Sequence, residues 1–296
     1  MTSAPAKSHE LQQPSQPTLD QKKAEGFAQK MVGVLNSAGL ALMVSIGHRT
    51  GLFEVMSKMP PSSSAEIADS ATLNERYVRE WLGAMVTGGI VEFDPVTQAY
   101  QLPQEHSAFL TPAASPNNLA VTAQFISVLG AVEDRVVECF RHGGGVPYSA
   151  YNRFHEVMAE ESDQTTGEAL LDAILPIVPA LEERMRAGIS VLDVGCGSGR
   201  AINLMAQEFP ASRFTGYDFS AEGIANAKKE AATKKLDNAH FEVKDVANLD
   251  QQQEYDLITA FDAIHDQARP AEVLQGIANA LKPDGVFLMQ DIAGSS

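Results

Sequence analysis

The chain has 296 residues, enough for two domains, of which 44% are apolar and 20% charged, a normal balance for a globular protein. Its formal net charge of −16 argues against nucleic-acid or anionic-membrane partners, because their phosphates repel an acidic surface. Neither Cys139 nor Cys196 has metal-site spacing, so we expect reduced thiols in a cytoplasmic protein; a catalytic Cys196 is the weaker alternative. We find no targeting leader and no apolar run of membrane-spanning length, and therefore expect no membrane contact.

The first part of the chain is expected to be a disordered tail followed by a helical region. Residues 1–20 are rich in Pro, Ser and Gln and lack a core. Residues 22–56 read as helix, broken near 36–39 and again at Gly51. Residues 40–46 are apolar on nearly every side and must be buried in a core or against another subunit. We favour a second subunit, hence a homodimer, because this part of the chain has little other mass to cover it.

Residues 21–110 are assigned to a winged-helix and dimerisation domain. Ser63 with Glu66 predicts a capping box that opens one helix, and Asn74 predicts the cap of a second helix that ends at residues 88–89. Residues 90–93 and 99–102 then read as the strands of a hairpin. This order of helix, turn, helix and hairpin is typical of a winged helix.

The charge of this domain disfavours binding to DNA. A recognition helix that meets phosphates should be basic. Between residues 61 and 102, however, the acidic residues outnumber the basic ones: Glu66, Asp69, Glu75, Glu80, Glu92 and Asp94 against Arg76 and Arg79. Nucleic acid is therefore an improbable partner, and dimerisation is the preferred role.

Residues 111–164 are assigned to a helical linker that also contributes to a substrate pocket. The glycine-rich string 143–148 predicts an irregular loop, either a plain linker or a substrate-side loop that carries Tyr148. Phe154 and Met158 are spaced to share one face of a helix, where packing in a core is an equally good interpretation. Residues 165–188 read as one further helix with a bend at Pro176 or Pro179.

The segment 189–200, ISVLDVGCGSGR, is the strongest pattern in the chain. A short apolar run leads into Gly195, Gly197 and Gly199, and a helical pattern follows. A buried strand, a glycine turn and a helix are typical of nucleotide binding. The spacing does not give G-x-G-x-x-G, and no Lys-Ser or Lys-Thr follows, so NAD, FAD and a phosphate-binding P-loop are disfavoured.

Residues 165–296 alternate between strand and helix patterns, which predicts an α/β fold with a Rossmann-like, doubly wound parallel sheet. The expected strands after the glycine turn cover 214–217, 241–243, 255–260 and 286–290, and the expected helices cover 221–235 and 270–281. Ligands bind at the carboxyl ends of such strands. Asp193, Asp218 and Asp245 all fall at those ends, and Asp218 is placed to accept the hydroxyls of a ribose.

The pattern D-x-G-x-G-x-G at 193–199 resembles the class I S-adenosylmethionine (SAM) methyltransferases, and the chain from about residue 25 is similar to plant-type small-molecule O-methyltransferases. That resemblance implies SAM as cofactor, no metal, and methyl transfer to a small-molecule acceptor at an oxygen. The family sheet continues for two more strands, so strand 286–290 is expected to be a bare edge, as in a fragment or a variant with an open pocket. The cofactor-binding residues implied are Ser162, Asp193, Gly195, Gly197, Gly199, Asp218, Phe219, Asp245, Val246 and Phe261.

The resemblance also implies catalytic and substrate residues. A His-Asp pair follows the same strand in the family, which makes His265 the expected general base, and Asp291 the expected carboxylate that holds it. The alternative is a histidine that only lines the site of an enzyme needing no base. Residues 154–162 resemble the family segment F-N-x-A-M-x-x-x-S, with His155 in place of Asn, and imply substrate contacts from Phe154 and Met158. Tyr148, on the loop before this segment, is the third expected substrate residue. The rival functions are a SAM-binding winged-helix regulator and a truncated, inactive SAM-binding form.

Overall fold

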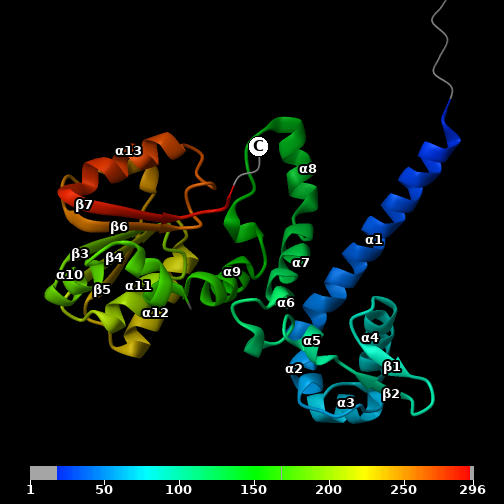
Figure 1. Ribbon diagram of the computed structural model, residues 1–296. Helices are drawn as coiled ribbons and strands as arrows, with labels where there is room; N and C mark the ends of the chain where they lie inside the picture. The colour runs from blue at the N-terminus through cyan, green and yellow to red at the C-terminus, as the bar shows by residue number, and fades with distance from the viewer. Residues whose placement is uncertain (1–18, 168, 294–296) are drawn as a thin grey trace, which may run out of the picture.

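The computed structural model describes residues 19–167 and 169–293, so all but the last two residues of the expected tail 1–20 lie outside the described residues. Figure 1 shows three parts in chain order: a winged-helix part that includes the long helix α1, a run of short helices in the middle, and an α/β part with the sheet. The middle helices join the other two parts. The predicted fold class is confirmed.

The winged-helix part has the predicted order of elements. It consists of α1 (Gln21–Arg49), α2 (Leu52–Ser57), α3 (Ser64–Ala71), α4 (Glu75–Thr87), β1 (Glu92–Asp94) and β2 (Ala99–Gln101). The capping box of Ser63 and Glu66 opens α3, and Asn74 caps α4 by accepting from the N–H of Arg76. β1 and β2 form the antiparallel hairpin. The apolar faces of these helices meet in one core around Trp81, Leu82 and Met85.

Helix α1 is continuous from Gln21 to Arg49, so the predicted break near 36–39 is wrong. A glycine inside a helix costs only about 1 kcal/mol relative to alanine and does not by itself end the helix. The predicted break at Gly51 is confirmed, because this residue adopts the left-handed backbone (φ 71°) between α1 and α2. Near its end, α1 packs on the core, where Trp81 Nε1 donates to the carbonyl of Met43 at 2.8 Å.

The first half of α1 projects away from the rest of the molecule (Figure 1). Among the described residues, α1 is long and apolar enough to cross a membrane, with a mean hydropathy of 1.5 over an 18-residue window that is 17% buried. The expectation that the chain has no apolar run of this length is therefore wrong. Core helices of soluble proteins meet the same two criteria, so length and composition alone do not assign α1 to a membrane.

The middle of the chain is built from short helices. They are α5 (Gln104–Ser107), α6 (Leu119–Thr122), α7 (Gln124–Gly130), α8 (Glu133–His142) and α9 (Phe154–Ser162). The next helix, α10 (Leu181–Ala187), packs on the core of the α/β part. Residues 143–147 form the predicted irregular loop. The single helix predicted over 165–188 is wrong: wide π-type turns at Asp163–Gly167 and Leu170–Ile174 and a 3-10 turn at Leu175–Ile177 precede α10. Pro176 lacks an N–H and cannot continue an α-helical ladder.

The α/β part contains a five-stranded sheet in which all paired strands run parallel, in the order β5-β4-β3-β6-β7. Its elements are β3 (Ser190–Val194), α11 (Arg200–Glu208), β4 (Arg213–Asp218), α12 (Ala221–Lys234), β5 (Ala239–Val243), β6 (Tyr255–Phe261), α13 (Pro270–Ala280) and β7 (Leu281–Gln290). Successive residues of β3 face opposite sides of the sheet. Val191 packs with α11 and α12, and Leu192 packs with α13.

The topology places a binding crevice beside the glycine turn. The chain leaves β3 for β4 on one side of the sheet and later reaches β6 on the other side, so the order reverses at β3. Ligands of doubly wound sheets bind at such a switch point, outside the carboxyl ends of the strands. Among the described residues β7 pairs only with β6, as expected for an edge strand.

Candidate functional site

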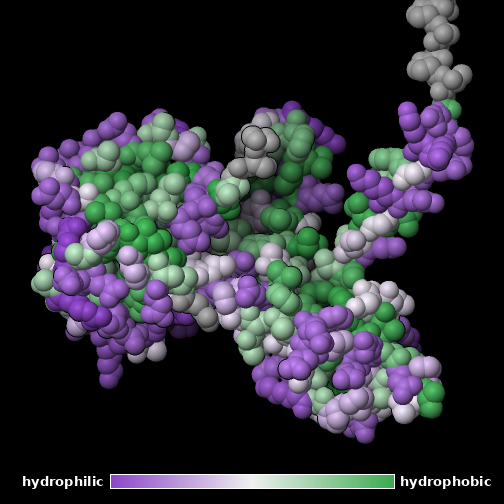
Figure 2. Space-filling model, in the orientation of Figure 1, coloured by the Kyte–Doolittle hydropathy of each residue, from purple (hydrophilic) through white to green (hydrophobic). Residues whose placement is uncertain are grey.

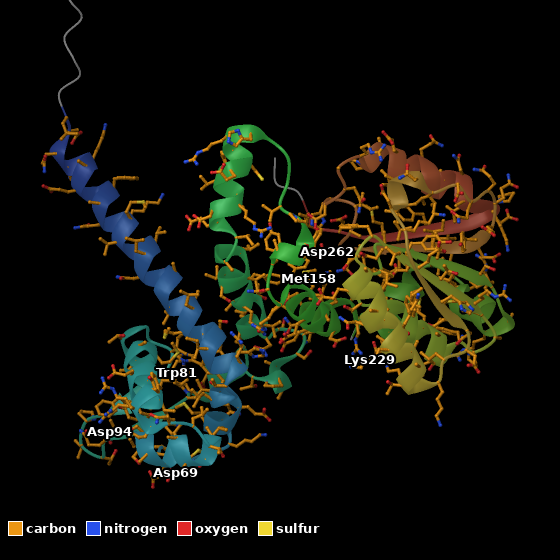
Figure 3. The ribbon with its side chains drawn as sticks, turned by 180° about the vertical axis from the view of Figure 1, so that it is seen from behind. Asp69, Trp81, Asp94, Met158, Lys229 and Asp262 are labelled. Carbon is orange, nitrogen blue, oxygen red and sulfur yellow. The ribbon has the colours of Figure 1, made fainter. Side chains whose placement is uncertain are left out.

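A pocket with about 1140 Å³ of space, partly open to solvent, lies at the carboxyl ends of the strands. One wall is the glycine turn after β3 with the ends of β4 and β6, and the opposite wall is α9. Figure 3 shows Met158 of α9 and Asp262, which follows β6, near each other where α9 meets the α/β part. Of the predicted residues, the pocket lining includes Tyr148, Phe154, Met158, Ser162, Asp193, Gly195, Gly197, Asp218, Phe219, Val246 and Phe261.

The glycines of the turn have different surroundings. Gly197 has φ 51°, and a Cβ added to it would meet no protein atom within 4 Å, so the space beside it is open. Gly199 has φ 73°, but a Cβ there would lie 2.6 Å from both Ala227 Cβ and Phe241 Cε1. Gly199 is therefore required for packing α11 against its neighbours, and it lies outside the pocket lining. Gly197 is the glycine against which a ligand can lie.

The carboxylate of Asp218 is held at the end of β4. Its Oδ2 accepts from the N–H of Gly197 at 2.9 Å, and its Oδ1 accepts from the N–H of Ser220 at 2.7 Å. Each carboxylate oxygen can accept more than one hydrogen bond. Asp218 is thus oriented by backbone groups and keeps acceptor capacity for hydroxyl groups of a ligand.

Asp193 is the most buried acid of the pocket, with 3% of its surface exposed. Its Oδ1 accepts from the hydroxyl of Thr259 at 2.7 Å. Burial, assisted by the nearby charge of Asp218, raises the pKa of Asp193 to about 7, although the Thr259 hydrogen bond opposes this shift. A cationic group of a ligand would favour its ionised form.

Asp245 does not line the pocket. Its Oδ1 accepts from the N–H of Ala247 at 2.9 Å, and its Oδ2 accepts from Asn248 Nδ2 at 3.0 Å, so both oxygens cap the short turn at Val246–Asn248. The adjacent Val246 is buried and lines the pocket. The structure thus brings Val246, rather than the carboxylate beside it, to the cavity.

Aromatic side chains cover the α9 side of the pocket. The ring of Tyr148 lies 4.8 Å from that of Phe154 and 5.3 Å from that of Phe219, measured between centroids. Its hydroxyl donates to Asp266 Oδ2 at 3.4 Å. Burial, followed by the charge of Asp266, raises the pKa of Tyr148 to about 12, so this tyrosine keeps its proton at neutral pH.

His265 and Asp291 form the predicted pair at the rim of the pocket. His265 Nδ1 lies 2.6 Å from Asp291 Oδ1, and Asp291 Oδ2 accepts from the N–H of His265 at 3.2 Å. Partial burial acts to lower the pKa of His265, but the hydrogen bond with Asp291 and the charges of Asp266, Asp291 and Asp262 outweigh it and raise that pKa. Neither residue of the pair is part of the pocket lining, whereas the neighbouring Asp262 and Asp266 are.

The same rim offers atoms that can bind a metal ion. One ligand atom each from Asp262, His265 and Asp291 lies within 4.8 Å of the others. Metal binding competes with the role of His265 as a base, because the ion would occupy the imidazole lone pair.

Comparison with known proteins divides the chain in the same way as the fold. Residues 38–112 match the family described as "Rv2258c-like winged HTH domain", and residues 185–295 match the family described as "Methyltransferase domain". The chain thus couples a winged helix-turn-helix domain to a methyltransferase domain. The predicted resemblance and fold are thereby confirmed.

Curated relatives match a little more than a third of the chain. Trans-aconitate 2-methyltransferase of Escherichia coli (strain SE11) is 32% identical over 116 residues, which are 38% of this chain and 44% of that protein. The enzyme of the same name from Shigella flexneri matches to the same extent. The chain thus spans less than half the length of the curated relatives that it matches.

Solved structures match most of the chain and show its fold. Mitomycin 7-O-methyltransferase is 17% identical with a TM-score of 0.62, covering 93% of this chain and 83% of its own. Human N-acetylserotonin methyltransferase in complex with SAM is also 17% identical, with a TM-score of 0.61 and coverages of 94% and 81%. An O-methyltransferase family protein from Burkholderia thailandensis has a TM-score of 0.63 at 17% identity, with coverages of 88% and 79%.

The pocket of the methyltransferase domain has groups that fit the parts of SAM. Gly197 leaves open space beside the turn, Asp218 offers acceptors to ribose hydroxyls, and Asp193 offers a buried carboxyl to a cationic group. The apolar Val246 and Phe261 line the same cavity. The chemistry of the pocket is therefore compatible with the cofactor.

Sequence reasoning missed several lining residues of this domain: Cys196, Ser198, Arg200, Ala201, Ser220, Asp262, Ala263, Asp266 and Gln267. Arg200 directly follows the glycine turn, and this position in the sequence could have predicted that it lines the pocket. Its guanidinium pairs with Asp163 and Glu230, so its charge is already compensated. Burial raises the pKa of the Cys196 thiol well above its usual value, which argues against the catalytic-thiol alternative.

Proposed function

We propose that the chain is a SAM-dependent methyltransferase that transfers a methyl group to an oxygen atom of a small molecule. The observation that carries the proposal is the pocket itself, in which the glycine turn and Asp218 face α9 across a cavity bordered by Asp262 and Asp266. SAM supplies an electrophilic methyl group when bound. The chain has to hold the acceptor oxygen in line with it, and positioning of this kind provides much of the rate acceleration.

His265 is the proposed general base. Asp291 binds its Nδ1, which leaves Nε2 as the nitrogen that accepts the proton of the acceptor hydroxyl. In this structure Nε2 lies 3.3 Å from Asp266 Oδ1, a contact that the acceptor would replace. Asp262 is the rival base, because it lines the pocket and because burial, with the charges of Asp291 and Asp266, raises its pKa.

The lining favours an acceptor without negative charge. Tyr148, Phe154 and Phe219 offer aromatic surface, while Asp262 and Asp266 repel anions. Arg200 is the one arginine or lysine among the described residues of the lining, and its charge is compensated by two carboxylates. A planar, uncharged hydroxy compound suits this surface better than trans-aconitate, the tricarboxylate named for the curated relatives.

The N-terminal domain is proposed to form a homodimer. Its free helix α1 exposes large apolar side chains, including Phe27 and Leu35. The rival role, a regulator that binds DNA with SAM as effector, lacks support from charge. The exposed surface of α4 carries Glu75 and Glu80 beside Arg76 and Arg79, which are paired with them.

Calorimetric titration with S-adenosylhomocysteine, the product form of the cofactor, tests the proposal. The unaltered protein is expected to bind with micromolar affinity, and Asp218→Ala is expected to weaken binding at least about tenfold, because a group in a ligand hydrogen bond typically contributes about 1.5 kcal/mol or more when charged. The exposed Asp237→Ala serves as the control. Unchanged affinity in Asp218→Ala would contradict the cofactor assignment.

Turnover separates an enzyme from an inactive SAM-binding form. Radiolabelled methyl transfer is measured against a panel of uncharged aromatic hydroxy compounds, with trans-aconitate included as the anionic comparison. Transfer to a hydroxy compound is expected. Binding of the cofactor without transfer to any acceptor would favour the inactive form.

A further inference from the structure

Helix α9 provides Phe154, Met158 and Ser162 to the pocket, yet it belongs to the middle part of the chain and not to the methyltransferase domain. The half-buried His155 lies between the two. Its Nε2 is 2.8 Å from Ser220 Oγ, which lies in the turn that follows β4. Among the described residues, this is the one side-chain hydrogen bond between α9 and residues beyond 185.

Ser220 is also tied to the cofactor side of the pocket. Its N–H donates to Asp218 Oδ1 at 2.7 Å, and its Oγ accepts from the N–H of Gly223 at 3.1 Å, which caps α12. The other oxygen of Asp218 accepts from Gly197. A continuous series of hydrogen bonds therefore runs from His155 through Ser220 and Asp218 to the glycine turn.

The outer face of α9 is held by the middle and N-terminal helices. Glu160 accepts from Gln124 Nε2 at 2.7 Å and lies 2.7 Å from His48 Nε2, while Arg153 donates to Gln124 Oε1 at 2.8 Å. The helix is thus fixed on the side away from the pocket. On the pocket side, His155 makes the hydrogen bond that leads to Asp218, and Asp163, at the C-terminal end of α9, pairs with Arg200 beside the glycine turn.

We propose that His155 is a positioning residue that couples occupancy of the cofactor site to the docking of α9. A ligand that fixes Asp218 also fixes Ser220, because the two belong to one hydrogen-bonded turn, and Ser220 then holds α9 through His155. The bound cofactor thereby completes the acceptor wall that carries Phe154 and Met158. The coupling is reciprocal: loss of the His155 contact must weaken cofactor binding as well. This inference rests on the proposed function, since it takes Asp218 as a cofactor ligand.

The test combines calorimetry with hydrogen exchange, using S-adenosylhomocysteine as the probe. In the unaltered protein the probe is expected to slow amide exchange over residues 154–162. In His155→Leu that protection should disappear, and affinity should fall about fivefold, the effect of a typical net hydrogen bond of about 1 kcal/mol. His155→Gln places an amide close to the position of Nε2 and should restore both. His142→Leu, an exposed histidine on α8, is the matched control.

Each result has a distinct meaning. If the unaltered protein does not bind the probe, the proposed function itself fails. If it binds, and His155→Leu shows the same affinity and the same protection of α9, the coupling is absent and the inference is overturned. Failure of His155→Gln to restore a defect would also overturn it, because packing rather than the hydrogen bond would then be responsible.

A second route avoids dependence on the His155 variants. Ser220→Gly removes the same hydrogen bond from the other partner and keeps a residue that is tolerated at helix N-caps. It should lose the protection of α9 in the same way, and the double variant His155→Leu/Ser220→Gly should bind no more weakly than the weaker single variant. Additive losses would show that the two residues act independently.

Discussion

Asp193 changes charge within the pH range in which such proteins are assayed, because its pKa of about 7 lies far above that of an exposed carboxyl. S-adenosylhomocysteine carries an ammonium group, and in the proposed site this group pairs with Asp193 when the carboxyl is ionised. Affinity is therefore expected to fall about tenfold between pH 8 and pH 6, since the ionised fraction falls from about nine tenths to about one tenth.

Calorimetry in two buffers of different ionisation enthalpy checks this prediction, since binding at neutral pH should release a proton from Asp193. Asp193→Asn is the control: it keeps the acceptor for Thr259 and should remove the pH dependence. The same affinity at both pH values, with no proton release, would show that the cofactor does not contact this carboxyl.

The raised pKa of His265 predicts the pH dependence of catalysis. A base acts when it is deprotonated, so the rate is lost as the pH falls through that raised pKa. Asp291→Asn removes a carboxylate that favours the charged imidazole, and should move the acid limb of kcat/KM to lower pH by about one unit. An unchanged limb would point to another base, and Asp262→Asn identifies the rival if it abolishes the rate while His265→Ala does not.

Chelation separates the base from the metal alternative at the same three residues. With His265 as a base, dialysis against a chelator leaves the rate unchanged. If a metal ion is held by Asp262, His265 and Asp291, the rate is lost and a divalent cation restores it. Comparing the rates before and after chelation therefore decides whether these three residues provide a base or a metal site.

At the scale of the element, replacement by alanine is expected to have different effects at two glycines of one turn: one should lower stability and the other should weaken ligand binding. Gly199→Ala drives a Cβ into Ala227 and Phe241 and should lower the free energy of unfolding by about 1–3 kcal/mol. Gly197→Ala meets no protein atom, so it should cost less stability and instead weaken binding of S-adenosylhomocysteine. Urea denaturation and calorimetry on the same samples measure the two effects. Equal losses of stability would contradict the distinct roles.

The elements that the sequence predicted well are those with local signals. The capping residues Ser63 and Asn74 and the buried runs of the sheet are encoded within a few neighbouring positions, and these elements form where expected. The wide turns after α9 were missed because they depend on packing against the methyltransferase domain. The continuity of α1 across residues 36–39 was missed because propensity alone overestimates the cost of a glycine.

The same distinction holds within the site. Asp193, Gly197 and Asp218 lie at or just after the carboxyl ends of strands that a doubly wound sheet brings together, so their positions in the pocket could be predicted from the sequence. The contact between His155 and Ser220 joins residues 65 positions apart, and no periodicity or motif in the sequence predicts it. Only the packing of α9 on the domain reveals it.

At the scale of the whole molecule, the projecting half of α1 is the feature that requires a partner. The helix has 29 residues, and in its first half Phe27 and Leu35 are 64% and 67% exposed. Figure 2 shows apolar side chains along this free part. An isolated helix of about 15 residues is marginal in water, and apolar side chains at helical spacing are stabilised by burial against a second helix.

A homodimer through α1 is therefore expected in size-exclusion chromatography with light scattering. The double variant Phe27→Glu/Leu35→Glu should be monomeric and, by circular dichroism, less helical, because the freed segment loses its packing. Gln29→Glu/Asn36→Glu alters the opposite face of the same helix and should remain dimeric. A monomer with undiminished helicity in the unaltered protein would overturn the prediction, and flotation with neutral lipid vesicles would then show whether a bilayer, in place of a second copy, covers the apolar face.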